Sequence, residues 1–237
     1  MFAPFGEHTA ALGQVIENLA TYFAQIARPL LIKGATCEVI KILQALRPGH
    51  FTYREDKDNY DYVYLTQDLI NLKGRKYSAK KNHLNTFMKR YPIHQYLPIC
   101  KDLVPSCINI AIEWYRNRAP LDAMLLYEKD AIIEALNHFD DLGLTGGAIL
   151  VDGEVKAFAF GEPLNEDTIV IHIEKGNPEI RGIYQVINQQ FCEHAWYEYK
   201  YVNREEDMGI KGLRAAKQSY HPIMMIKKYD ITLRSKR

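Results

Sequence analysis

Apolar side chains along this sequence recur with two periods, one typical of helices and the other typical of strands. Spacings of three and four residues predict helices over residues 9–26, 36–46, 77–91, 105–116, 125–139, 181–197 and 207–219. Strand-type runs cover residues 29–32, 51–54, 60–65, 168–174, 200–203 and 222–226, and Asp152-Gly153 predicts a tight hairpin within 148–160. Helices and strands mixed in this way predict the α/β class (α+β mixed sheet). The basic tail Thr232–Arg237 is expected to fray.

One succession of elements occurs twice in the chain, which indicates an internal repeat. Each copy has a strand, a helix, a second strand and then an arginine followed by acidic residues, Arg54-Glu55-Asp56 in one copy and Arg204-Glu205-Glu206-Asp207 in the other. The first copy lacks a helix after this turn. We therefore expect two related α/β domains. The first is incomplete and covers residues 1–92, including a linker helix at 77–91, and the second is complete and covers residues 93–237.

The composition is that of an ordinary globular protein and limits the possible partners. Hydrophobic residues make up 47% of the 237 positions, charged residues make up 25%, and the formal net charge is +1. Because the charge is so close to zero, nucleic acid could be held only by a local basic patch. The 4 cysteines lack the spacing of metal ligands, and no apolar run approaches the roughly 20 residues of a membrane span. We expect a cytoplasmic protein with no bound metal and no integral membrane segment.

A strand with polar residues at alternate positions is the first candidate for chemistry. Within residues 168–174 the isoleucines face one side, whereas His172 and Glu174 face the other. If the sheet is covered on both faces, these two side chains line a cleft where burial and mutual charge tune a general base. The alternative is a solvated face. Glu162 and Asn165, which precede the strand, add polar groups at the same rim and favour the cleft.

Two loops that follow strands are candidates for binding a substrate. Residues 176–182 lead into a helix, so the first helix amides and Arg181 could hold a phosphate or carboxylate, although an ordinary capped turn has the same pattern. Asn203 and Arg204 stand at the carboxyl end of a strand, where open α/β sheets bind ligands. Glu205 follows them directly, and a solvated loop is the alternative.

Tyr220 and His221 precede the last predicted strand, and either could give a proton to a leaving group. A tyrosine and a histidine in this position can equally serve in packing.

Residues 71–90 carry lysines and arginines without any acidic residue. A basic segment in a nearly neutral chain is a candidate for binding RNA phosphates or another charged group, and a solvated helix face is the alternative. The candidate phosphate-binding residues are Arg75, Lys76, Lys80, Lys81 and His83.

Several motifs of this chain are specific enough to suggest a family. They are Gly74-Arg75-Lys76-Tyr77, Lys80-Lys81-Asn82-His83, Gly161-Glu162-Pro163-Leu164-Asn165, His172-Ile173-Glu174-Lys175 with Arg181-Gly182, Tyr201-Val202-Asn203-Arg204-Glu205-Glu206-Asp207 with Gly209, Gly212 and Leu213-Arg214, and Tyr220-His221-Pro222. Between about Leu30 and Tyr229 the sequence resembles the C-terminal domain family of phosphatidylglycerol lysyltransferases, in particular its stand-alone cytoplasmic bacterial members of unassigned activity.

The resemblance implies two tandem acyl-CoA N-acyltransferase (GNAT)-like domains, as in the Fem transferases. Compared with these relatives, we expect the first of the two domains to be truncated at its N-terminus. The membrane-bound relatives move a lysyl group from lysyl-tRNA to a lipid hydroxyl, but this sequence lacks their membrane-spanning half. Arg181-Gly182-Ile183-Tyr184 also lacks the full glycine pattern with which simple acetyltransferases hold the pyrophosphate of coenzyme A.

The sequence therefore predicts a transferase that moves an acyl or aminoacyl group to a small amine or hydroxyl acceptor. The donor is charged tRNA in the first hypothesis and acetyl-coenzyme A in the second, and a third hypothesis is a non-catalytic RNA-binding module that retains the fold. The catalytic candidates are His172 or Glu174 as base, Arg204 and Glu205 at the reacting group, and Tyr220 or His221 as acid. The substrate-binding candidates are Glu162, Asn165, Arg181, Asn203 and Arg214.

Overall fold

The computed structural model describes residues 1–2, 9–118 and 123–234. Contacts group the chain into two compact units. The first unit comprises Met1–Tyr62, Glu206–Ala215 and Met225–Arg237, and the second comprises Val63–Glu205 and Ala216–Met224. The predicted class, α/β with a mixed sheet, is confirmed. The predicted division into tandem halves at residue 92 concerns the origin of the fold and stays a prediction.

The first unit has a three-stranded antiparallel sheet in the order β1 (Leu31–Ala35), β10 (Tyr229–Leu233), β2 (Phe51–Glu55). The helices α1 (Thr9–Gln25) and α2 (Cys37–Leu46) belong to this unit. Ile16, Ile32, Leu43 and Ile231 form its core, because each helix contributes one apolar stripe to the apolar face of the sheet. Thr232 and Leu233 were expected to fray, but they form the end of β10, which pairs with strands on both sides.

The second unit contains most of a seven-stranded sheet. Its order is β4 (Gln95–Pro98), β5 (Thr145–Val151), β6 (Glu154–Pro163), β7 (Thr168–Gly176), β8 (Tyr201–Asn203), β3 (Asp61–Leu65), β9 (Met224–Ile226). Neighbouring strands are antiparallel from β4 to β7, whereas β7 and β8 are parallel. The parallel pairing involves only Thr168–Val170 and Tyr201–Asn203, so β7 continues beyond the point where β8 ends.

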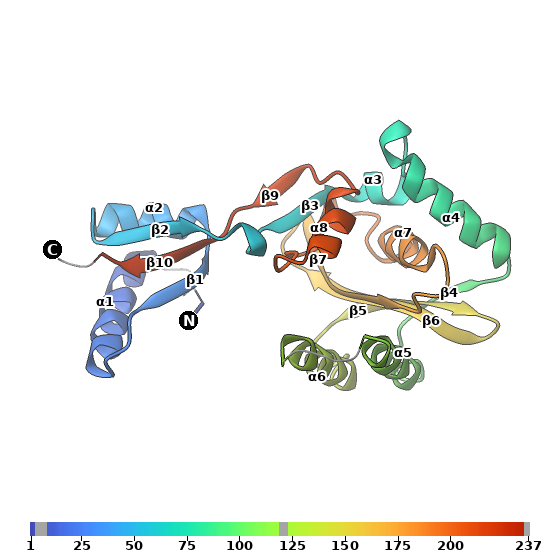
Figure 1. The fold of residues 1–237 in the computed structure, drawn as a ribbon, viewed down its shortest axis with the longest axis horizontal. Helices are drawn as coiled ribbons and strands as arrows, with labels where there is room; N and C mark the ends of the chain where they lie inside the picture. Colours follow the sequence, from blue (N-terminus) through green and yellow to red (C-terminus); the bar gives the residue numbers. More distant parts are fainter. Residues whose placement is uncertain (3–8, 119–122, 235–237) are drawn as a thin grey trace. The chain divides into compact units, whose positions relative to one another are not determined.

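Helices cover both faces of this sheet (Figure 1). One face carries α5 (Val104–Arg116) and α6 (Ala123–Asn137), whose apolar stripes pack on Phe158 and Phe160 of β6. The other face carries α7 (Ile183–Ala195), against which α3 (Thr66–Asn71) and α4 (Ser78–Arg90) pack. The segment predicted to link two halves, residues 77–91, is therefore a helix packed within the second unit. No helix in the described part of the chain is both long and apolar enough to cross a membrane.

The predicted hairpin is present, since Asp152 and Gly153 join β5 to β6 with positive φ angles of 53° and 79°. The helix predicted from residue 207 starts later, as α8 (Lys211–Gln218). Its expected first residue, Asp207, is instead a buried acceptor for Arg214 Nε at 2.8 Å, and Gly209 has a φ of 74° that no helix accommodates. The short elements α3, β4 and β10 were not predicted.

Candidate active site

The candidate site lies where β7 passes the end of β8, and a β-bulge determines its geometry. Phe160 pairs with Ile173 and Gly161 pairs with Ile171, so His172 is an extra residue on β7. Gly161 permits this close approach because a Cβ there would lie 2.0 Å from the carbonyl oxygen of Val170. The bulge changes the alternation of side chains along the strand.

Because of the bulge, His172 and Glu174 face opposite sides of the sheet, and the prediction that they face the same side was wrong. His172 lines a pocket together with its neighbour Ile173 and residues of α6. Glu174 accepts a hydrogen bond from Asn188 Nδ2 of α7 at 2.6 Å, on the other face. Sequence alternation holds only while the strand stays regular.

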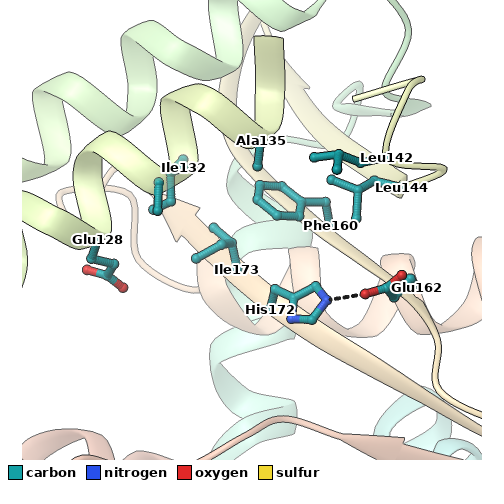
Figure 2. Close-up of a pocket in the computed structure, with 10 residues that line it drawn as sticks. Glu128, Ile132, Ala135, Leu142, Leu144, Phe160, Glu162, His172 and Ile173 are labelled. Atoms are coloured by element: carbon teal, nitrogen blue, oxygen red, sulfur yellow. Dashed lines mark hydrogen bonds and ion pairs between the residues drawn. The ribbon is translucent and has the colours of Figure 1, made fainter. Parts of the chain in front are cut away.

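His172 lies between two carboxylates. Its Nδ1 is 2.8 Å from Glu205 Oε1. Its Nε2 is 3.0 Å from Glu162 Oε1, the contact drawn in Figure 2. The hydrogen bond to Glu205 and then the negative charges of both carboxylates raise the pKa of His172, although partial burial opposes them. Both ring nitrogens donate when the imidazole is protonated, so the site favours the imidazolium. A protonated imidazole in this arrangement suits a proton donor, and the expected role of His172 as a general base stays a prediction.

The pocket beside His172 has a volume of about 350 Å³ and lies between α6, the loop before β5, and strands β6 and β7. Its walls are mainly aliphatic and aromatic, and the polar groups are confined to three side chains. The lining residues are Glu128, Ala131, Ile132, Ala135, Leu142, Leu144, Phe160, Glu162, His172 and Ile173.

Glu174 and Arg204 form an ion pair on the α7 side of the sheet, and their side chains are only 12% and 13% exposed. The guanidinium carbon of Arg204 lies 4.9 Å from the ring centre of Tyr220 and 5.7 Å from that of Tyr64. Burial disfavours the charged guanidinium, but the negative charge of Glu174 outweighs burial and raises the pKa of Arg204. Glu174 is thus occupied by Arg204 and Asn188, which argues against its expected role as a base.

One nitrogen of Arg204 remains available to a ligand. Nη2 binds Glu174, whereas the buried Nη1 has no hydrogen-bond partner in the described part of the protein. Nearby, Lys80 Nζ lies 4.4 Å from the ring centre of Tyr220, and burial followed by the charge of Arg204 lowers the pKa of Lys80. A buried donor without an acceptor is costly unless a substrate supplies one. Arg204 and Lys80 can together hold a carbonyl oxygen or another anionic group.

The predicted residues thus form two adjacent groups and not a single pocket. Glu162, His172 and Glu205 stand at the α6 pocket, whereas Glu174, Arg204, Tyr220 and Lys80 form a cluster with α7 and α4 that is not part of the pocket lining. The two groups are neighbours in the sequence, because Glu205 follows Arg204 directly and His172 precedes Glu174 by two residues.

Tyr220 and His221 do not match their predicted role as acids. Burial raises the pKa of Tyr220, which makes its phenol a weaker proton donor. His221 is exposed and its Nε2 is 3.0 Å from the backbone oxygen of Lys76, outside both groups. The aromatic ring of Tyr220 instead contacts both Lys80 and Arg204.

Three of the predicted substrate-binding residues are held by turns or ion pairs, and a fourth is exposed. Asn165 and Asn203 each accept a hydrogen bond from the backbone amide two residues later, as in Asx turns. Arg214 binds Asp207 and Asp58, and these contacts occupy its guanidinium. Arg181 is exposed at the start of α7. The geometry supports only Glu162 of this predicted set.

The start of α7 packs closely against α4, and the expected anion site there stays a prediction. Gly182 is buried, with a φ of 90°, and a Cβ there would lie 2.3 Å from the carbonyl oxygen of His83 in α4. His83 therefore supports the helix start through its backbone. Arg75, Lys76 and Lys81 of the basic segment are exposed, as a phosphate-binding surface requires.

Three important residues had no role in the sequence-based prediction. Glu128 binds the buried Lys175, whose ammonium lies 3.7 Å from the ring centre of Trp114. The adjacent Trp114-Tyr115 pair was the only sequence signal for this contact.

No cluster of three or more His, Cys, Asp or Glu side chains suited to a metal occurs among the residues that the structure describes.

The fold defines the class of protein to which this chain belongs. It is shared with L-PGS from Bacillus licheniformis, which is 14% identical with a TM-score of 0.67 and covers 100% of this chain and 77% of that chain. Residues 1–232 match the family described as phosphatidylglycerol lysyltransferase, C-terminal. The chain belongs to this family, and the sequence-based prediction of the family is confirmed.

Two further proteins are similar to this chain over most of its length. A protein of unknown function from Bacteroides thetaiotaomicron VPI-5482 is 38% identical with a TM-score of 0.87, over 94% of this chain and 76% of that chain. An uncharacterized protein of Mycoplasmoides gallisepticum is 26% identical over 230 residues, which is 87% of this chain and 73% of the relative.

Proposed function

We propose that this protein is an acyltransferase that moves an aminoacyl or acyl group from an activated ester to an amine or hydroxyl acceptor. The observation that carries the proposal is the buried guanidinium of Arg204, whose Nη1 has no acceptor in the described part of the chain. A donor fixed in a buried site stabilises the negative charge that develops on a carbonyl oxygen during acyl transfer. Membership of a transferase family supports the same reaction class.

The side chains have distinct roles in the proposed acyl transfer. The acceptor nitrogen or oxygen attacks the acyl carbon, and Arg204 with Lys80 binds the carbonyl oxygen as it becomes negative. The acceptor gives up a proton as it attacks, and the leaving oxygen takes up a proton, so the step balances; Glu162 and His172, which line the pocket on the other face of the sheet, are not assigned to this step. The new bond to the acyl carbon forms, the ester bond to the donor breaks, and the donor leaves as an alcohol.

We favour charged tRNA as the donor. Arg75, Lys76 and Lys81 give an exposed cationic surface, which RNA phosphates require. The backbone of His83 packs closely against Gly182 at the helix start where a coenzyme A pyrophosphate would bind, and this favours the first donor over coenzyme A. A cytoplasmic location, where charged tRNA is found, is part of this proposal.

A panel of tRNAs charged with labelled amino acids tests the proposal. We expect protein-dependent transfer or deacylation with at least one of them, and a loss of at least about 100-fold for Arg204→Gln, the range measured for single oxyanion donors. Arg116→Gln is the matched control, because Arg116 is exposed at the end of α5. The proposed donor is wrong if no charged tRNA reacts, or if both substitutions have the same effect.

Acetyl-coenzyme A is the second candidate donor. It predicts thermal stabilisation by coenzyme A, since a ligand at 100 times its Kd adds about 2.7 kcal/mol. An unchanged melting curve at millimolar coenzyme A excludes it in practice. A third candidate is an RNA-binding module without turnover. The exposed cations are the one observation that favours it. It predicts salt-sensitive RNA binding in the absence of any transfer.

A further inference from the structure

The pocket next to His172 has a distinct arrangement of polar and apolar groups. Glu128 and Glu162 stand at opposite ends of it, and Ile132, Phe160 and Ile173 lie between them (Figure 2). Its volume of about 350 Å³ suits a small molecule and not a polymer. A ligand that fills it must have an apolar body.

The two ends differ in charge. At one end Glu128 is neutralised, because Lys175 Nζ lies 3.1 Å from its Oε1 and Tyr115 donates to its Oε2. At the other end His172 lies between two carboxylates, Glu162 and Glu205, so even a protonated imidazole compensates only one of their two negative charges. One negative charge therefore remains at the His172 end, where the side chain of Glu162 is 45% exposed.

We propose that this pocket binds a primary aliphatic amine, with its alkyl chain against Ile132, Phe160 and Ile173 and its ammonium group on Glu162. The cation compensates the remaining charge, and the chain covers apolar walls that would otherwise face water. An anionic acceptor, such as a phosphate-bearing head group, would meet Glu162 and Glu205 without any uncompensated cation among the lining residues. The assignment of this amine as the acceptor rests on the proposed acyl transfer, whereas its binding does not.

Binding is tested with three six-carbon probes of equal length, hexylamine, hexan-1-ol and hexanoate, by calorimetric titration of the full chain at neutral pH. We expect hexylamine to bind tightest and hexanoate weakest. Glu162→Gln should weaken hexylamine about fivefold, the upper range for a partly exposed ion pair, and leave hexan-1-ol unchanged. Ala135→Phe should abolish binding of all three, because the ring fills the pocket.

Glu166→Gln provides the matched control, since Glu166 is exposed and stands four positions after Glu162. It should leave all affinities unchanged. Circular dichroism establishes that each variant is folded, and if Ala135→Phe does not fold, Glu162→Gln still separates the outcomes.

The inference is overturned if hexanoate or a short-chain phosphatidylglycerol binds more tightly than hexylamine, or if Glu162→Gln and Glu166→Gln behave alike. Its failure is distinguishable from failure of the proposed function. Hexylamine that binds but is never acylated, with any donor, contradicts acyl transfer and leaves the binding site standing. Acyl transfer to a hydroxyl compound, without any binding of hexylamine, supports the proposed function and contradicts the amine-binding site.

Discussion

The ion pair between Glu174 and Arg204 allows a quantitative test of the site's electrostatics. Replacing Arg204 with Met leaves the carboxylate of Glu174, which is 12% exposed, without its ion pair, while the hydrogen bond from Asn188 remains. Loss of one partner of a buried ion pair typically costs about 3–5 kcal/mol, because the other charge stays buried and uncompensated. The contact with the ring of Tyr220 adds about 1 kcal/mol to this loss. We therefore expect Arg204→Met to lower the free energy of unfolding by about 5 kcal/mol.

A double-mutant cycle separates the charge effect from general damage. Glu174→Leu alone leaves the guanidinium of Arg204 buried without its carboxylate, and should cost a similar amount. The double variant has no uncompensated charge, so we expect it to be more stable than either single variant predicts, with a coupling of at least about 2 kcal/mol. Urea unfolding followed by circular dichroism at pH 7 measures all four proteins, provided that their m values agree.

Two results would refute this reasoning. One is a cost below about 1 kcal/mol for Arg204→Met, which is the value for a solvated surface pair. The other is simple addition of the two single effects within about 0.5 kcal/mol, which would mean that the two side chains act independently.

Three further predictions concern the bulge, the imidazolium and the buried amine. Gly161→Ala should lower the free energy of unfolding in urea by about 3 kcal/mol, because the new Cβ would lie 2.0 Å from a backbone oxygen. Gly212→Ala is the control in α8, where a Cβ would have no atom within 4 Å, and it should stabilise the protein slightly. Equal effects of the two substitutions would contradict this prediction. The hydrogen bond to Glu205 and the flanking charges raise the pKa of His172, so its stabilisation is complete below about pH 6.5 and disappears as pH rises through the folded-state pKa. His172→Gln should therefore cost more stability at about pH 5.5 than at about pH 9, and a pH-independent cost would show that the imidazolium is not stabilised. Lys80→Met should leave stability unchanged or raise it by up to about 1 kcal/mol, while lowering acyl transfer at least about tenfold; loss of stability without loss of transfer would assign a structural role.

The sequence alone determined most helices and strands of this protein. Amphipathic stripes placed α1, α5 and α7 to within a few residues, because burial of one helix face is a local pattern that recurs every turn. The hairpin at Asp152-Gly153 was equally local, since few residue pairs accept two positive φ angles. The motifs also identified the family. The element β10 was missed because it is short and pairs with β1 and β2, which lie far from it in the sequence.

The tertiary structure decided how the candidate residues work. The sequence identified Glu162, His172 and Arg204, but it placed His172 and Glu174 on one face and assigned one or the other as the base. Strand alternation depends on neighbouring residues, whereas the bulge depends on the register between β6 and β7 and on the absence of a Cβ at Gly161. Likewise, the carboxylates around His172 stand 10 positions before it and 33 positions after it. Its protonation depends on contacts between distant segments, and only the folded chain brings these segments together.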